Sequence, residues 1–138
     1  MKDLDIIPIL VVSNTQNKAE MLNGLLRSEG LAVHPHWVNT VENWEEQKIT
    51  PELVFYFDDI GKPTLKEVLA ATRDMAAALI VVSPKHDQAR AAAAIDLGAT
   101  TQVCLTDTSL LAGIARREHH SRDDRAKLKA LERELEQN

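Results

Sequence analysis

The chain has few of the features that mark disulfide-rich, membrane-spanning or nucleic-acid-binding proteins. Its 138 residues include a single cysteine, Cys104, so no intrachain disulfide can form, as is typical of reduced, cytoplasmic proteins. No apolar run approaches the roughly 18 residues of a membrane span. Asp3 and Asp5 lie where a signal peptide would need an apolar core. The net charge of -5 argues against nucleic acid as the main partner, because phosphate binding requires a basic face.

Residue patterns for cofactors, metals and nucleophiles are also absent. The five glycines are scattered, so neither a dinucleotide site nor a P-loop is predicted. His34 and His36 share one strand face by period 2, but no Cys or third His lies nearby, and we expect no metal site. Cys104 lies in an apolar stretch and Ser83 lacks a nucleophile elbow, so neither is expected to be catalytic. We predict no enzymatic activity and no cofactor.

Short apolar runs alternate with helical patterns along most of the chain. Five strand–helix units of this length imply a parallel sheet covered on both faces, because each crossover helix packs back onto the sheet. We predict an α/β, doubly wound, flavodoxin-like fold with strand order 2-1-3-4-5. The predicted strands are Ile6–Val12, Leu31–Val38, Leu53–Phe57, Ala78–Ser83 and Thr101–Leu105.

Capping residues mark where the helices begin. Ser13 followed by Gln16 is a capping-box signature. Thr40, Thr64 and Asp87 can each cap the helix that follows them. These residues predict the start of the helix after each of the first four strands.

The C-terminal segment has a different composition. From Arg116 onward most residues are charged, and leucines at 128, 131 and 135 follow a 3–4 heptad spacing. Upstream positions of the same seam are polar, so a short coiled coil or a helical connector fits, and a long zipper does not. We predict a domain over residues 1–118 and a charged helical linker over 119–138 that leads to a further domain.

Ligands of a doubly wound sheet bind at the carboxyl ends of the strands. We expect the candidate site at this edge. None of the residues that end the first, third, fourth and fifth strands is charged: they are Ser13, Asn14, Phe57, Ser83 and Leu105.

This layout resembles the receiver domains of two-component response regulators, which have the CheY-like fold. The resemblance covers about residues 6–118. It implies a signalling module whose partners are proteins. The phrases that carry it are PILVVSN from Pro8, PELVFYFDD from Pro51, LIVVSP from Leu79 and DLGATTQVCL from Asp96.

The family's chemistry does not follow from the resemblance. Receivers hold Mg²⁺ with an acidic pair where this chain has Ser13 and Asn14, and they accept the phosphoryl group on an aspartate where it has Phe57. Their lysine aligns with Leu105, and the hydroxyl after the fourth strand is kept as Ser83. Phosphoryl transfer needs metal and lysine to neutralise the developing charge. We therefore expect a pseudo-receiver that is not phosphorylated by the usual route.

Two other interpretations stay open. Asp58 follows Phe57 directly, and a one-residue offset turns a strand side chain to the other face. Beyond the strand end it could turn back, which would give an atypical working receiver with Lys62 or Lys85 as the cation. The aromatic switch residue of receiver domains aligns with Gln102 in this chain.

The second open interpretation is a small-ligand site at the point where the strand order of the sheet reverses.

The stretch TQNKAEMLNGLL from Thr15 narrows the resemblance to the degenerate N-terminal receiver of FimX-like proteins. Those proteins regulate type IV pili, carry PAS, GGDEF and EAL domains, and sense cyclic di-GMP through the EAL domain. The resemblance implies a cytoplasmic protein at the cell pole, with no nucleotide bound by these residues.

The family commonly dimerises through its fourth helix, fifth strand and fifth helix. The counterpart here is Gln88–Leu97, Thr101–Leu105 and Leu110–Arg117. The run Ala91–Ala94 would allow close approach by another helix, although alanine is also simply a strong helix former. We expect a protein partner or a second copy at this face, and neither nucleic acid nor a membrane.

Overall fold

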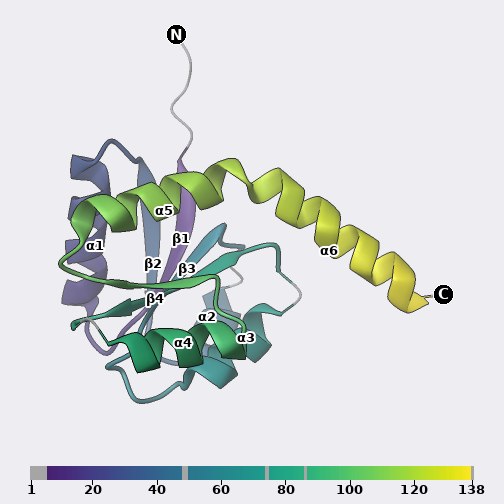
Figure 1. Ribbon diagram of the computed structural model, residues 1–138, viewed down its shortest axis with the longest axis horizontal. Coiled ribbons are helices and arrows are strands. Elements are labelled where there is room, and N and C mark those ends of the chain that lie inside the picture. The colour runs from purple at the N-terminus through teal and green to yellow at the C-terminus, as the bar shows by residue number, and fades with distance from the viewer. Residues whose placement is uncertain (1–5, 48–49, 74, 86, 138) are drawn as a thin grey trace, which may run out of the picture.

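A five-stranded parallel sheet with the order β2-β1-β3-β4-β5 forms the centre of the computed structural model, which describes residues 6–47, 50–73, 75–85 and 87–137. Figure 1 shows this sheet with its helices and the long C-terminal helix. The predicted flavodoxin-like fold is confirmed. The strands are β1 (Ile7–Val12), β2 (Val33–Val38), β3 (Leu53–Phe57), β4 (Ala78–Ser83) and β5 (Thr101–Cys104). The helices are α1 (Gln16–Ser28), α2 (Val41–Gln47), α3 (Leu65–Thr72), α4 (Gln88–Leu97), α5 (Thr108–His120) and α6 (Arg122–Gln137).

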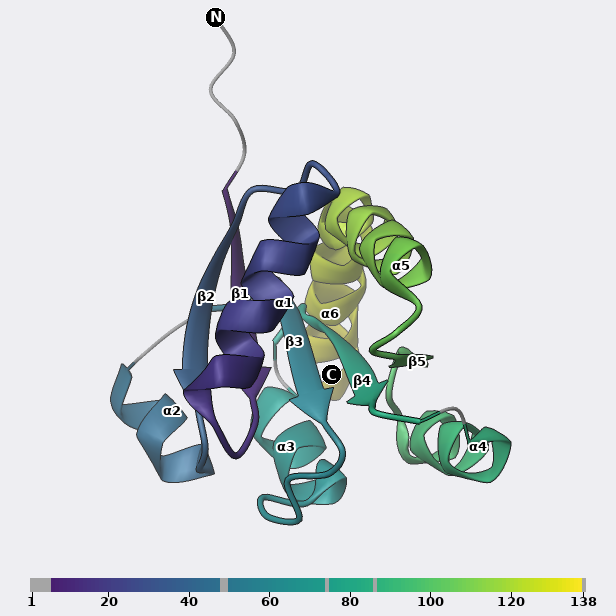
Figure 2. The same cartoon turned by 90° about the vertical axis from the view of Figure 1, so that its left-hand side faces the viewer.

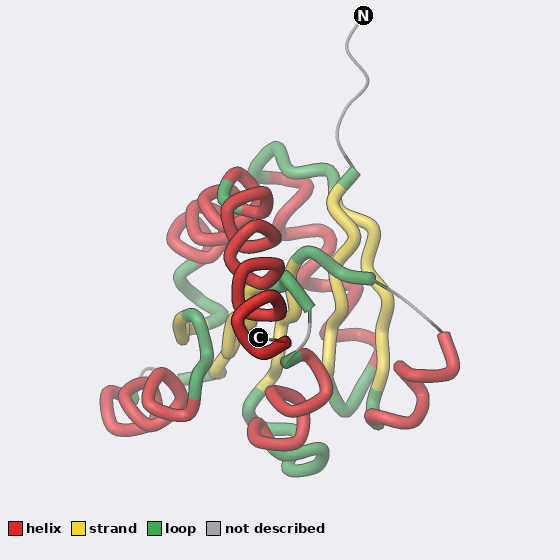
Figure 3. Tube along the Cα trace, turned by 90° about the vertical axis from the view of Figure 1, so that its right-hand side faces the viewer, coloured by secondary structure: helices red, strands yellow, loops and turns green. Residues whose placement is uncertain are grey.

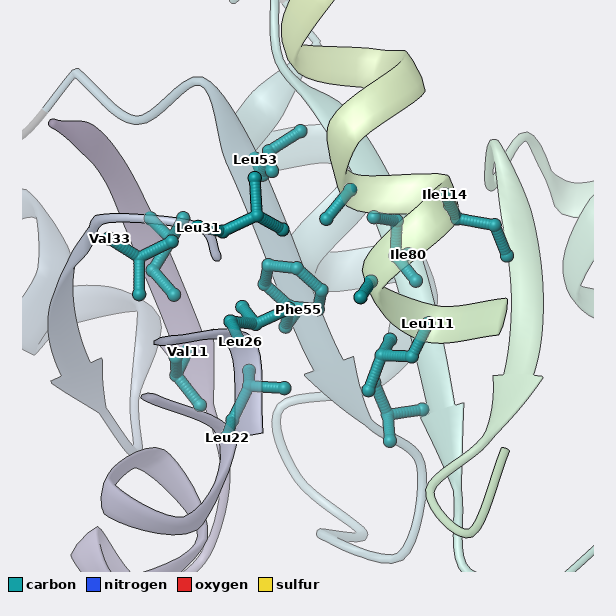
Figure 4. Packing of buried hydrophobic residues seen from close by; sticks show 14 of the residues in the cluster. Val11, Leu22, Leu26, Leu31, Val33, Leu53, Phe55, Ile80, Leu111 and Ile114 are labelled. Carbon is teal, nitrogen blue, oxygen red and sulfur yellow. The ribbon is translucent and has the colours of Figure 1, made fainter. Parts of the chain in front are cut away.

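Two apolar layers cover the faces of the sheet, and Figure 2 shows the helices that surround the sheet. On one face, Phe55 of β3 lies among Leu22 and Leu26 of α1 and Leu111 of α5 (Figure 4). On the other face, Tyr56 lies in the layer that α2, α3 and α4 cover. Successive strand side chains point to opposite faces, so β3, which is buried throughout, contributes to both layers.

Side-chain caps fix the starts of three helices. Thr64 and Glu67 form a reciprocal capping box at α3. Asp87 and Thr40 each accept a hydrogen bond from a backbone N–H in the first turn of α4 and α2. Such caps satisfy N–H groups that have no partner within the helix, and all three were predicted from the sequence.

Helix α6 is held to the domain by a charged cluster at the amino ends of β3 and β4, and Figure 3 looks onto that side of the molecule. We call it the α6 clasp; its members are Glu52, Glu118, His119, Arg122 and Arg125. Helix α5 continues to His120, past the domain boundary predicted at residue 118, which stays a prediction. No helix in the described ranges is long and apolar enough to cross a membrane.

Candidate functional site

Ser13 lies where β1 ends and is fully buried, with 0% exposure. Its hydroxyl donates to the Thr15 carbonyl at 2.7 Å, and the Trp37 indole N–H lies 3.1 Å from both its hydroxyl and its carbonyl oxygen. The predicted capping box at Ser13 is wrong: Thr15 is the N-cap of α1, and its side chain makes no cap bond. Ser13 is still paired with β2 through its backbone N–H, so its hydroxyl stays at the sheet. Asn14 is exposed.

Phe57 ends β3 on the α1/α5 side of the sheet and is 2% exposed. The Lys18 ammonium lies 5.7 Å from the centroid of its ring and 2.5 Å from Asp59 Oδ2. A cation near an aromatic ring is attracted by the quadrupole of that ring. Lys18 therefore links Phe57 to Asp59 and occupies this side of the strand edge.

Asp58 lies on the opposite side, toward α3 and α4, with 14% of its side chain exposed. Its Oδ2 accepts a hydrogen bond from the Ser83 hydroxyl, which itself accepts one from the Gln102 amide at 2.5 Å. Gln102, Ser83 and Asp58 thus form a hydrogen-bonded chain across β5, β4 and β3. The other carboxylate oxygen, Oδ1, is buried without a hydrogen-bond partner among the described residues.

The cation beside Asp58 is Arg90, whose guanidinium nitrogen lies 3.7 Å from Oδ2. The predicted cations were Lys62 and Lys85, and both are exposed. Sequence reasoning missed Arg90, although a signal existed. The cap at Asp87 starts α4 beside this edge, so the first turn of that helix was a reasonable place to look for a charge.

Leu105 follows β5 and puts an apolar group at the fifth strand end. It is half-buried against the α1/α5 layer, and its backbone N–H donates to the Ser83 carbonyl at 2.9 Å. Elsewhere, the rings of His34 and His36 lie 4.7 Å apart on β2, as their period predicted. Within the described ranges, no group of three or more His, Cys, Asp or Glu side chains could hold a metal ion.

Tyr56 lines a groove of about 190 Å³ between α3 and α4, together with Asp58 and Arg90. The Tyr56 hydroxyl donates to the Pro63 carbonyl at 2.8 Å. Burial raises the pKa of Tyr56 to about 12, and the nearby carboxylates of Asp58 and Glu67 add to the effect. The phenol is therefore a neutral donor over the whole physiological range.

We expect tyrosinate absorbance to show Tyr56 titrating near pH 12 in the folded protein, against its ordinary value of 10.0. Since the folded-state pKa is raised, the stability that the neutral phenol contributes is present below pH 10 and is lost as pH rises from 10 to 12. Tyr56 is the only tyrosine, so the signal has one source. The urea-unfolded chain is the matched control, and a midpoint near 10 in the folded protein would contradict the burial described here.

Comparisons with known proteins give similarity at the level of the fold. No family model matches the sequence, and no curated protein matches it. Among solved structures, the chain is similar to NtrX from Brucella abortus in complex with ADP, at 18% identity and a TM-score of 0.72, over 92% of this chain and 29% of that one. It is also similar to a response regulator from Thermotoga maritima, at 15% identity and a TM-score of 0.66, over 83% and 98% of the two chains.

A third solved structure is a fusion that contains a trimeric coiled coil from yeast. It is 19% identical with a TM-score of 0.71, over 98% of this chain and 95% of that one. The neighbours include response-regulator receiver domains, so the chain has the receiver fold that the sequence predicted. The narrower resemblance to FimX-like proteins stays a prediction.

Proposed function

We propose that this domain is a pseudo-receiver, a non-enzymatic module of a signalling protein whose surfaces, rather than phosphoryl chemistry, carry its function. The observation that supports this most is the environment of Phe57. An apolar ring, 2% exposed, ends the central strand where the resemblance places a phosphoacceptor. On the other side of the strand, Asp58 is bonded to Ser83 and lies beside Arg90.

The residues at this edge do not fit the Mg²⁺ ion that the fold family implies. Mg²⁺ takes near-octahedral oxygen ligands, normally with one or two carboxylates and several waters. The Ser13 hydroxyl is bonded to a backbone carbonyl and covered by Trp37. The Asp59 carboxylate is paired with Lys18 of α1. The oxygen ligands at this edge therefore offer Mg²⁺ too little negative charge and too little room.

A working receiver that uses Asp58 is the second candidate. Its support is the uncommitted oxygen Oδ1, together with the Ser83 hydroxyl and the Arg90 cation beside the carboxylate. Against it stands the direction of the side chain, which lines the groove between α3 and α4, on the side of the sheet opposite Phe57.

Intact mass after incubation with acetyl phosphate and Mg²⁺ separates the two candidates. We expect the wild-type chain to gain no phosphoryl group, because no metal ligand set among the described residues faces an acceptor. A receiver of known activity is the positive control. If the wild-type chain gains one phosphoryl group, and if this gain is lost in Asp58→Asn but kept in the matched variant Asp59→Asn, the domain is a working receiver. The pseudo-receiver proposal would then be wrong.

The predicted interaction face carries exposed apolar side chains. Ile95, Leu97 and Leu110 are 51%, 46% and 55% exposed, and α4 buries Ala94 while most of its other residues are exposed. Large apolar side chains exposed on these elements favour a protein interaction site there. We propose that α4, β5 and α5 contact a protein partner.

The FimX-like resemblance extends this proposal to cyclic-di-GMP signalling at type IV pili, with the domain acting in localisation at the cell pole. In that case residues 119–138 lead toward a downstream domain. A GGDEF or EAL signature encoded after Asn138 is the observation that would support this narrower role.

A further inference from the structure

Helix α6 carries an apolar ridge that faces solvent. Leu128, Leu131 and Leu135 are 59%, 56% and 76% exposed. Their spacing of three and then four residues aligns them along one side of the helix. Large apolar side chains exposed together on an otherwise charged helix indicate a surface that another helix covers. We call these three residues the leucine ridge.

The leucine ridge lies to one side of the contacts that hold α6 to the domain. Arg122 and Arg125 face the domain through Glu52 and Glu118. With about 3.6 residues per turn, the ridge lies about a third of a turn around the helix from these arginines. Docking of α6 therefore leaves the ridge open, and Figure 1 shows α6 running out past the sheet.

We propose that the leucine ridge pairs with the ridge of a second copy of this chain in a parallel, two-stranded coiled coil. In heptad terms Leu128 and Leu135 are a positions and Leu131 is a d position, which makes Lys127 a g position and Glu132 an e position. In a parallel pair, each g side chain faces the e side chain of the next heptad on the partner. Lys127 would thus meet Glu132 of the partner subunit, and the two-fold symmetry of the pair makes this contact twice.

The same residues favour the parallel direction. A parallel pair in register stacks each leucine of the ridge on its own copy, which gives three apolar layers. An antiparallel pair aligns a positions with d positions, so that either Leu128 or Leu135 meets Leu131 of the partner subunit. Each of these two registers leaves one leucine of each chain without a leucine opposite it, and so gives one apolar layer fewer than the parallel pair.

This inference rests on the proposed role as an interaction module and names one partner and one surface for it. It does not depend on Asp58. The phosphorylation measurement can therefore overturn the pseudo-receiver while the pairing stands, and the cross-linking experiment below can overturn the pairing alone.

Cysteine cross-linking in the full 138-residue chain tests the pairing. Cys104 is first replaced by alanine, and Leu135→Cys is compared with Ala130→Cys, a neighbouring exposed position on another side of α6. A disulfide needs Cα atoms about 4.4–6.8 Å apart, which the parallel pair offers at 135 and not at 130. We expect a disulfide-linked dimer with Leu135→Cys at high protein concentration, and monomer with Ala130→Cys. Equal yields at the two positions would overturn the proposal, as would a dimer that forms through Leu131→Cys but not Leu135→Cys.

Sedimentation velocity of the Cys104→Ala chain gives an independent test. A ridge of three leucines is short, so we expect weak, concentration-dependent association. Lys127→Glu weakens it by opposing Glu132 of the partner subunit, and the double variant Lys127→Glu, Glu132→Lys restores it. A monomer at every concentration, a trimer, or a double variant that is no better than the single one would overturn the parallel dimer.

Discussion

Replacing Phe57 with aspartate is expected to destabilise the domain rather than to restore a phosphoacceptor. The ring is 2% exposed in the layer between the sheet and α1 and α5, and deletion of a buried aromatic side chain costs about 3–5 kcal/mol. The new carboxylate would add a desolvation penalty, since it would lie among apolar side chains without a metal ion. We expect the free energy of unfolding, measured in urea, to fall by at least about 4 kcal/mol.

Phe57→Leu is the matched control, because it keeps a buried apolar side chain and adds no charge, and it should cost less than the about 3–5 kcal/mol of a full aromatic deletion. The Lys18 ammonium lies 5.7 Å from the centroid of the Phe57 ring, but it also lies 2.5 Å from Asp59 Oδ2 and would have to leave that partner to reach the new aspartate. If Phe57→Asp kept its stability within about 1 kcal/mol of the wild type and gained a phosphoryl group, a latent receiver site would exist. The pseudo-receiver proposal would then be wrong.

Much of the fold could be predicted because apolar runs and caps mark elements locally. The bounds of β3, β4 and α4 agree with the prediction. The start of β2 does not: the prediction placed it at Leu31, and it lies at Val33. The Leu31 backbone N–H is bonded to the Leu26 carbonyl, which closes the end of α1 around Gly30 at φ 89°. An apolar run cannot reveal that its first residue completes the preceding helix.

The candidate site was predictable only in part. Period 2 correctly separated Phe57 from Asp58 onto opposite sides of the sheet. The contacts of Asp58 with Ser83 and Arg90 join residues far apart in the sequence. The cap at Asp87 indicated where α4 begins, but which side chains then meet depends on the spacing of neighbouring strands, which no local pattern encodes.

Arg125 is expected to give the second large effect, through the α6 clasp. Its guanidinium donates to the Glu118 carbonyl at 2.6 Å and to the Glu118 carboxylate at 3.1 Å. It also donates to the backbone carbonyls of Ala76 and Glu52, at 3.1 and 3.4 Å. Hydrogen bonds from charged groups contribute about 1.5–3 kcal/mol, and the partners of Arg125 are partly shielded from water. We expect Arg125→Met to lower the free energy of unfolding by about 2–3 kcal/mol.

Hydrogen exchange shows whether that loss releases α6. A 16-residue helix has only marginal stability on its own, so the amides of α6 should lose their protection against exchange in Arg125→Met. The amides of β1, β3 and β4 should lose only as much protection as the lower free energy of global unfolding accounts for. Ala130→Met, on an exposed position of the same helix away from the leucine ridge, is the control and should leave both readouts unchanged. The clasp lies at the amino ends of β3 and β4, and Tyr56 lies near their carboxyl ends. The titration of Tyr56 should therefore be the same in Arg125→Met and the wild type. A shifted titration, or undiminished protection of α6, would show that the clasp does not act as a local anchor of this helix.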